Sequence, residues 1–146
     1  MILQDDWDVE TIPDILKSYE SATRFDKHWY KAWHAWALAN FEVITHFEKV
    51  HSVENSSEDG NVAEASAENN AELQQEVLRY VVPSVQGFVQ SIALSQGSCL
   101  QDTLRLLTLW FKYGYHEEVS QAISNGFNSV SIDTWLEVIP QVCCIN

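Results

Sequence analysis

Residues 96 to 113 read Gln-Gly-Ser-Cys-Leu-Gln-Asp-Thr-Leu-Arg-Leu-Leu-Thr-Leu-Trp-Phe-Lys-Tyr. Ser98 and Gln101 have the spacing of an N-terminal capping box and Gly114 can end a helix, so the stretch predicts one helix. Its main apolar stripe is Leu100, Thr103, Leu104, Leu107, Trp110 and Phe111, while Leu106 and Leu109 point elsewhere. A helix this apolar must be covered on several sides, which indicates an inner helix of a stacked helical array.

The composition excludes several classes of function. The chain has 146 residues, enough for one domain, and acidic residues outnumber basic ones 21 to 8. A net charge of −13 argues against nucleic acid as a partner, because neutralising phosphates requires clustered Lys and Arg. No run of 18 apolar residues occurs, so we expect no direct insertion into a membrane. The three cysteines form no disulfide framework, which favours a reducing, cytoplasmic compartment.

Residues 1–50 predict a helical hairpin. The first helix covers about residues 12–23 with Thr11 as its cap, and the second covers about residues 27–50. One side of the second helix carries Trp29, Trp33, Trp36, Asn40, Ile44 and Phe47. Core packing is the favoured role of these tryptophans, with ligand stacking the alternative. A buried amide needs partners, so we expect Asn40 to bond a neighbouring backbone turn.

Residues 51–72 interrupt the helical pattern. This acidic, low-complexity segment consists mainly of Ser, Asn, Glu and Ala, and it has no aromatic residue and no Lys or Arg. Such a composition cannot bury enough apolar surface to offset the entropy lost on ordering. We therefore expect a disordered insert at this place.

Residues 73–146 predict further helices of the HEAT type, with the chain ending inside the last one. The third helix begins near Leu73, and Pro83 should kink it or split it. Residues 98–113, 117–130 and those after Asp133 give three more helices. The fold class is therefore all-α, an α-solenoid of antiparallel helical hairpins of the TPR or HEAT type, with one disordered acidic insert.

No constellation of catalytic residues is present. The run from Tyr115 to Glu118 begins like a zinc protease motif, but Ser120 stands where a second histidine is needed. His28, His34 and His46 fit polar-face or interface positions better than a metal site. Phosphate-binding loops and kinase motifs are missing as well. We expect no enzyme activity, no metal and no cofactor in this chain.

Four blocks of the sequence resemble one known family and follow each other in the family's order. They are residues 29–37 (Trp-Tyr-Lys-Ala-Trp-His-Ala-Trp-Ala), 80–87 (Tyr-Val-Val-Pro-Ser-Val-Gln-Gly), 100–111 and 132–140 (Ile-Asp-Thr-Trp-Leu-Glu-Val-Ile-Pro). These blocks are similar to the FAT region of the target-of-rapamycin serine/threonine kinases, within the phosphatidylinositol-3-kinase-related family. The family also carries a variable insert where residues 51–72 fall.

The resemblance implies a non-catalytic scaffold in a larger kinase of growth and nutrient signalling. Its partners would be the kinase domain, the other FAT repeats of the same chain and the subunits of the target-of-rapamycin complex. The parent complex would act in the cytoplasm, at lysosomal, vacuolar or other endomembrane surfaces. The alternative is a stand-alone α-solenoid adaptor that binds a helix or peptide in its groove.

The resemblance also implies one ligand for the full-length kinase. Members of the family hold inositol hexaphosphate in a basic pocket of the FAT region. Lys31 lies in the matching Trp-Tyr-Lys-Ala-Trp motif, and Lys27 lies one turn before it. These two lysines would be minor contacts, because most of the pocket would come from upstream repeats.

Overall fold

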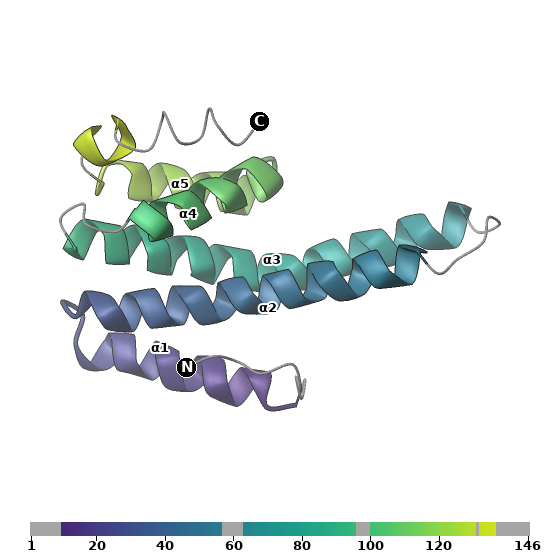
Figure 1. Cartoon of the computed structure of the whole chain (residues 1–146), viewed down its shortest axis with the longest axis horizontal. Helices are drawn as coiled ribbons and strands as arrows, with labels where there is room; N and C mark the ends of the chain where they lie inside the picture. Colours follow the sequence, from purple (N-terminus) through teal and green to yellow (C-terminus); the bar gives the residue numbers. More distant parts are fainter. Residues whose placement is uncertain (1–9, 57–62, 96–99, 131, 137–146) are drawn as a thin grey trace.

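The computed structural model describes residues 10–56, 63–95, 100–130 and 132–136, with side chains placed for all of these except 53–56 and 63–70. The helices are α1 (Ile12–Phe25), α2 (Tyr30–Ser56), α3 (Ala63–Leu94), α4 (Leu100–Tyr113) and α5 (Glu117–Phe127). Figure 1 shows them stacked in the order of the chain, with α1 against α2, α2 against α3, and α4 and α5 over the far side of α3. Only helices and their connections occur in the described part, which confirms the all-α solenoid.

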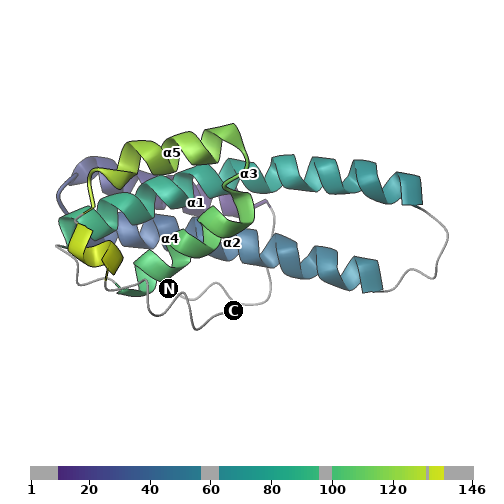
Figure 2. The same ribbon diagram turned by 90° about the horizontal axis from the view of Figure 1, so that it is seen from above.

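The α2–α3 hairpin is the axis of the molecule. Its two helices run side by side, and their distal ends project beyond the other helices (Figures 1 and 2). They approach closely because Gly87 faces Ala37: a Cβ on Gly87 would lie 2.7 Å from the Ala37 Cβ. Ser84 Oγ, fully buried beside this contact, donates a hydrogen bond of 2.9 Å to the Ala37 carbonyl. Small residues therefore set the distance between α2 and α3.

The hairpin differs from the disordered insert expected for residues 51–72. α2 continues to Ser56 and α3 already begins at Ala63, while residues 57–62 lie outside the described residues. Extending an existing helix adds one hydrogen bond for each residue fixed, whereas starting one is costly. The Ala- and Glu-rich segment can thus prolong both helices without a core of its own.

Pro83 neither splits α3 nor ends it, since the helix runs unbroken from Ala63 to Leu94. A proline inside a helix removes one backbone hydrogen bond and costs about 3 kcal/mol. Here Val81 and Val85 on either side of it are fully buried. Packing on both sides of the proline keeps the two halves in one helix.

α1 and the start of α2 are fixed by the turn between them. Thr11 precedes α1 as expected, but its side chain makes no capping hydrogen bond. Asp26 ends α1, and its Oδ1 accepts a 3.0 Å hydrogen bond from the backbone N–H of His28. α2 therefore begins at Tyr30 rather than at Lys27, and Trp29 stays outside it, 51% exposed.

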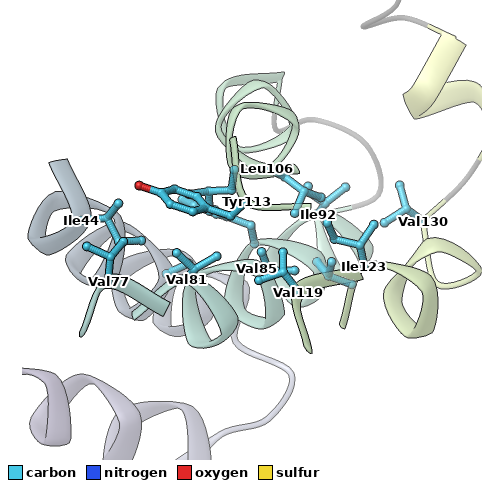
Figure 3. Close-up of a cluster of buried hydrophobic side chains, with 14 residues drawn as sticks. Ile44, Val77, Val81, Val85, Ile92, Leu106, Tyr113, Val119, Ile123 and Val130 are labelled. Atoms are coloured by element: carbon cyan, nitrogen blue, oxygen red, sulfur yellow. The ribbon is translucent and has the colours of Figure 1, made fainter. Parts of the chain in front are cut away.

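The core lies where α2, α3, α4 and α5 meet, and Figure 3 shows its side chains converging. It consists of Ala37, Ile44, Val77, Val81, Val85, Phe88, Val89, Ile92, Leu106, Leu109, Tyr113, Val119, Ile123 and Val130. Six of these fourteen residues come from α3, more than from any other helix, so this helix is the one covered on several sides.

For α4 the expected apolar stripe was partly wrong. Leu106 and Leu109 are buried, whereas Trp110 is 38% exposed and Phe111 is 67% exposed. The remaining buried positions of α4 are Asp102, Thr103, Leu107 and Tyr113. α4 is covered on one side by α3 and α5, and its other side is open within the described part of the chain. It is a peripheral helix, and not the inner helix that the sequence predicted.

The remaining predictions have mixed outcomes. Asn40 is buried and its Nδ2 donates a 2.8 Å hydrogen bond to the Trp36 carbonyl, as predicted. Helix α5 ends at Phe127, three residues before the predicted end. Residues 132–136 are helical, as expected for the start of the last helix, and residues 137–146 lie outside the described residues.

Candidate functional site

A buried carboxylate joins three helices of the stack. Asp102, in the first turn of α4, is 2% exposed. Its oxygens accept hydrogen bonds from His34 Nδ1 of α2, at 2.7 and 2.9 Å, and from Ser91 Oγ of α3, at 3.0 Å. Arg105 Nη1, one turn further along α4, donates a fourth hydrogen bond of 3.2 Å. A carboxylate buried among apolar neighbours needs such partners, and Asp102 has four contacts from three side chains.

The position of Asp102 also suits its charge. The first turn of a helix carries the positive end of the macrodipole, which favours an acidic side chain there. His34 must carry its proton on Nδ1, because both atoms that it faces are carboxylate oxygens. Its side chain is 37% exposed, so the imidazole bridges the buried carboxylate and the solvent.

The trio of Ser91, His34 and Asp102 is not arranged for nucleophilic catalysis. In a hydrolase triad the serine hydroxyl bonds to the imidazole, which removes its proton. Here the Ser91 hydroxyl donates to the carboxylate instead, and it is fully buried. The arrangement fixes helices and activates no hydroxyl.

A second polar contact links α4 and α2 near the other end of α4. Glu48 of α2 accepts a hydrogen bond from the Tyr113 hydroxyl and pairs with Lys112 Nζ at 3.1 Å. Burial, together with the hydrogen bond and the negative charge of Glu48, raises the pKa of Tyr113 well above its usual value. His34 and Glu48 lie fourteen positions apart on α2, and their partners Asp102 and Tyr113 lie eleven apart on α4. α4 is therefore held to α2 at both of its ends.

Sequence reasoning found one member of this network and missed the others. His34 was assigned to a polar face or an interface, and it lies at the interface of α2 with α4. Asp102 and Ser91 were not singled out. A usable signal existed, since Ser84 and Ser91 interrupt an otherwise apolar stripe of α3 at helical spacing, and both are fully buried.

The two lysines predicted to contact inositol hexaphosphate lie at the turn between α1 and α2. Lys27 is in the connection and Lys31 is in the first turn of α2, and both are exposed. Neither makes an ion pair within the described residues, whereas Arg24 pairs with Glu20 at 2.8 Å. The Lys27 backbone is fixed, because its carbonyl accepts a 2.9 Å hydrogen bond from Trp33 Nε1. The turn presents two free cations on an otherwise acidic chain.

Exposed aromatic side chains gather on the first and last layers of the stack. Phe25 at the end of α1 is 96% exposed, and Trp29 and Tyr30 follow it. On α4 the rings of Trp110 and Phe111 stack with centroids 6.4 Å apart. We call these the α1 surface (Phe25, Trp29 and Tyr30) and the α4 surface (Trp110 and Phe111). Clusters of exposed apolar side chains commonly mark interaction sites.

Comparison with known proteins assigns the family. Residues 2–108 match the model of the FAT domain. The chain belongs to the FAT domain family. It is 48% identical over 141 residues to the fission yeast serine/threonine-protein kinase tor1 and 43% identical over 154 residues to TOR2 of Saccharomyces cerevisiae. It is also 43% identical over 143 residues to mTor of Drosophila melanogaster.

These alignments include 96% of this FAT chain but only 5% of tor1 and 6% of TOR2 and mTor. The chain thus spans about a twentieth of the length of the curated relatives it matches. Among its described residues no group of His, Cys, Asp or Glu could hold a metal ion. Within the same residues, no helix is long and apolar enough to cross a membrane.

Proposed function

We propose that this chain is a non-catalytic helical scaffold within a TOR-type serine/threonine protein kinase. It clamps and positions the kinase domain, and it supports assembly of the parent complex in growth and nutrient signalling. The FAT family match over residues 2–108 carries this proposal. The small share of each relative that the chain covers agrees with the role of one module in a long protein.

The geometry supports the same role. The interior of the stack is fixed by polar contacts from Asp102 and Glu48, so α2, α3 and α4 can act as one unit. The α1 and α4 surfaces remain exposed on its first and last layers. Modules of a solenoid bury such faces against neighbouring repeats. The parent chain would supply those neighbours, together with the kinase domain.

Co-purification of this chain with the separately expressed remainder of its parent kinase tests the proposal. We expect association, and we expect Phe25→Ser or Phe111→Ser to weaken it severalfold without unfolding the chain. Ser120→Ala, an exposed substitution on α5, is the matched control. The isolated chain should neither bind ATP nor transfer phosphate. Phosphotransfer that follows the pure chain through purification would overturn the scaffold role.

We further propose that Lys31 and Lys27 make minor contacts with inositol hexaphosphate in the full-length kinase. The full-length kinase would act in the cytoplasm. The support is the pair of exposed cations on a turn whose backbone is fixed by Trp33. Several converging cations are needed for a polyanion, so the isolated chain should bind it poorly. Calorimetry on full-length protein should show weaker binding after Lys31→Ala and no change after Lys17→Ala, an exposed lysine on α1. Equal affinity of both variants would remove Lys31 from the site.

A further inference from the structure

One side of α2 is covered by no other helix within the described residues. Its members follow each other at spacings of three or four positions, so they lie on one side of the helix, and we call this side the outer face of α2. It consists of Lys31, Ala35, Leu38, Glu42, Thr45 and Lys49. None of these residues is buried, and the lysine at each end is exposed.

The outer face lies between the contacts that α2 makes with α1 and with α4. Ala32, Ala39 and Val43 are buried but do not belong to the core that α2 shares with α3, α4 and α5, which leaves α1 as their cover. On the opposite side, His34 bonds Asp102 of α4. The outer face is therefore a strip of α2 that lies between two neighbouring helices and is free to receive a further segment.

Positive charge prevails on and beside the outer face, although the chain as a whole carries −13. Lys31 and Lys49 make no ion pair within the described residues, and the Arg105 side chain, which is close enough to act on Glu42, is 30% exposed. The nearby carboxylates are Glu42, which is partly buried, and Asp102, which is buried and already accepts hydrogen bonds. Three cations beside two carboxylates favour an occupant with acidic groups.

The chain itself contains a segment of matching chemistry. Residues 1–9, which lie outside the described residues, read Met-Ile-Leu-Gln-Asp-Asp-Trp-Asp-Val. They carry three aspartates and no Lys or Arg, together with the apolar residues Ile2, Leu3 and Trp7. Covering Ala35 and Leu38 with these apolar groups would remove apolar surface from water, which is favourable.

The same segment is attached at the right place and is long enough. It joins α1 through residues 10 and 11, and the beginning of α1 lies beside the middle of α2 (Figure 1). Nine extended residues span up to about 30 Å, and the outer face is about 27 Å long from Lys31 to Lys49. Burial raises the pKa of Glu42, whereas the N-terminal ammonium group and Arg105 lower it. The charge at the start of the chain thus acts on the middle of the outer face.

We propose that residues 1–9 fold back over the outer face of α2, pack their apolar side chains against Ala35 and Leu38, and place their aspartates beside Arg105 and His34. The inference goes beyond the scaffold role, because it decides which side of α2 stays accessible to other proteins. With the outer face occupied, the α1 and α4 surfaces are the ones left for docking.

Paramagnetic broadening in NMR spectra tests this contact. A nitroxide is attached at Leu3→Cys in an isotope-labelled chain whose three native cysteines are replaced by serine. We expect the amide signals of Ala35, Leu38 and Glu42 to lose most of their intensity. The signal of Ser120, an exposed residue on α5, should keep its intensity.

Substitution of the acidic residues tests the match of charge. The triple variant Asp5→Asn, Asp6→Asn and Asp8→Asn should roughly halve the broadening, because each exposed ion pair contributes little. Asp14→Asn, an exposed aspartate on α1, is the matched control and should leave the broadening unchanged. Circular dichroism should show the same helix content in all variants.

Three outcomes would overturn the proposal. Absent or uniform broadening would show that the segment does not occupy the outer face. Broadening that ignores the three aspartates would remove the match of charge. Broadening of an isotope-labelled chain that is mixed with a separate nitroxide-labelled chain would assign the face to a second copy. Association with the remainder of the kinase is measured independently, so the scaffold role stands or fails separately.

Discussion

His34 Nδ1 lies 2.7 Å from Asp102 Oδ2, although 68 positions separate the two residues in the sequence. The carboxylate is buried and also accepts from Ser91 and Arg105, so α2, α3 and α4 share one acceptor group. Removing a shared acceptor leaves several donors unsatisfied at once, and a buried donor without a partner is more costly than a lost hydrogen bond alone.

Asp102→Ala should therefore lower the free energy of unfolding by about 2–4 kcal/mol. His34→Ala should cost less, about 1 kcal/mol, because the imidazole is partly exposed. Urea unfolding followed by circular dichroism measures both. Gln101→Ala, at an exposed neighbouring position, should change stability by less than about 0.5 kcal/mol. A cost for Asp102→Ala no larger than that of the control would show that the shared acceptor contributes nothing.

Gly87→Ala should destabilise the hairpin by about 1–3 kcal/mol, as overpacking in a tight contact does. The added methyl group would meet the Ala37 Cβ at 2.7 Å and the Trp33 carbonyl oxygen at 3.1 Å. Ala37→Gly removes the nearest of these atoms, so in the double variant the losses should be less than additive. Thermal denaturation of the four proteins in this cycle decides the point, and strictly additive losses would argue against a direct contact.

Trp110→Ala should lower the free energy of unfolding by only about 1–2 kcal/mol. Truncating a fully buried leucine such as Leu109 to alanine lowers it by about 2–5 kcal/mol. The reason is that the Trp110 ring lies at the open face of α4 and stacks on the more exposed Phe111. Leu109→Ala is the matched comparison on the same helix. A larger loss of stability for Trp110→Ala than for Leu109→Ala would show instead that Trp110 is buried, as the sequence predicted.

Alkaline pH should release the contact between Tyr113 and Glu48. The pKa of Tyr113 is raised in the folded protein by burial and by Glu48, so the protonated phenol favours folding. Its contribution is complete below the ordinary tyrosine value of 10.0 and is lost as pH rises above that value. Tyr113→Phe should make the free energy of unfolding depend less on pH in this range.

Urea midpoints between about pH 8 and 11 give the comparison, because the tyrosine titrates near 10 when unfolded. Tyr30→Phe serves as the control, since Tyr30 is exposed at the start of α2 and does not contribute to the raised pKa of Tyr113. Identical pH profiles for the wild type and Tyr113→Phe would show that the contact between the Tyr113 phenol and Glu48 does not contribute to stability.

Much of the fold could be predicted from the sequence, because helical periodicity and turn residues are local signals. The positions of α1, α4 and α5 and a backbone partner for the buried Asn40 follow from such patterns. Which face of α4 is covered could not be predicted, because both faces are apolar and only the placement of α3 selects Leu106 and Leu109.

The hydrogen-bond network around Asp102 was harder to predict from the sequence for a similar reason. An aspartate in the first turn of a helix usually stays in solvent, stabilised by the macrodipole. Its burial depends on Ser91 and His34, which lie on other helices and share no local pattern with it. The sequence also did not predict that α2 continues to Ser56 and that α3 begins at Ala63. A polar composition shows that a segment cannot form a core, but it does not show how easily the segment extends an existing helix.

Hydroxyl-radical footprinting of Phe25, Trp110 and Phe111 gives the most direct test of a scaffold role. These side chains are exposed in this chain, and a module that holds the kinase domain should bury them against the rest of the parent protein. We predict that they oxidise several times more slowly in the full-length kinase than in the isolated chain. The oxidation rate of the exposed Tyr115 serves as the reference. Equal oxidation rates in the two proteins would contradict the scaffold account.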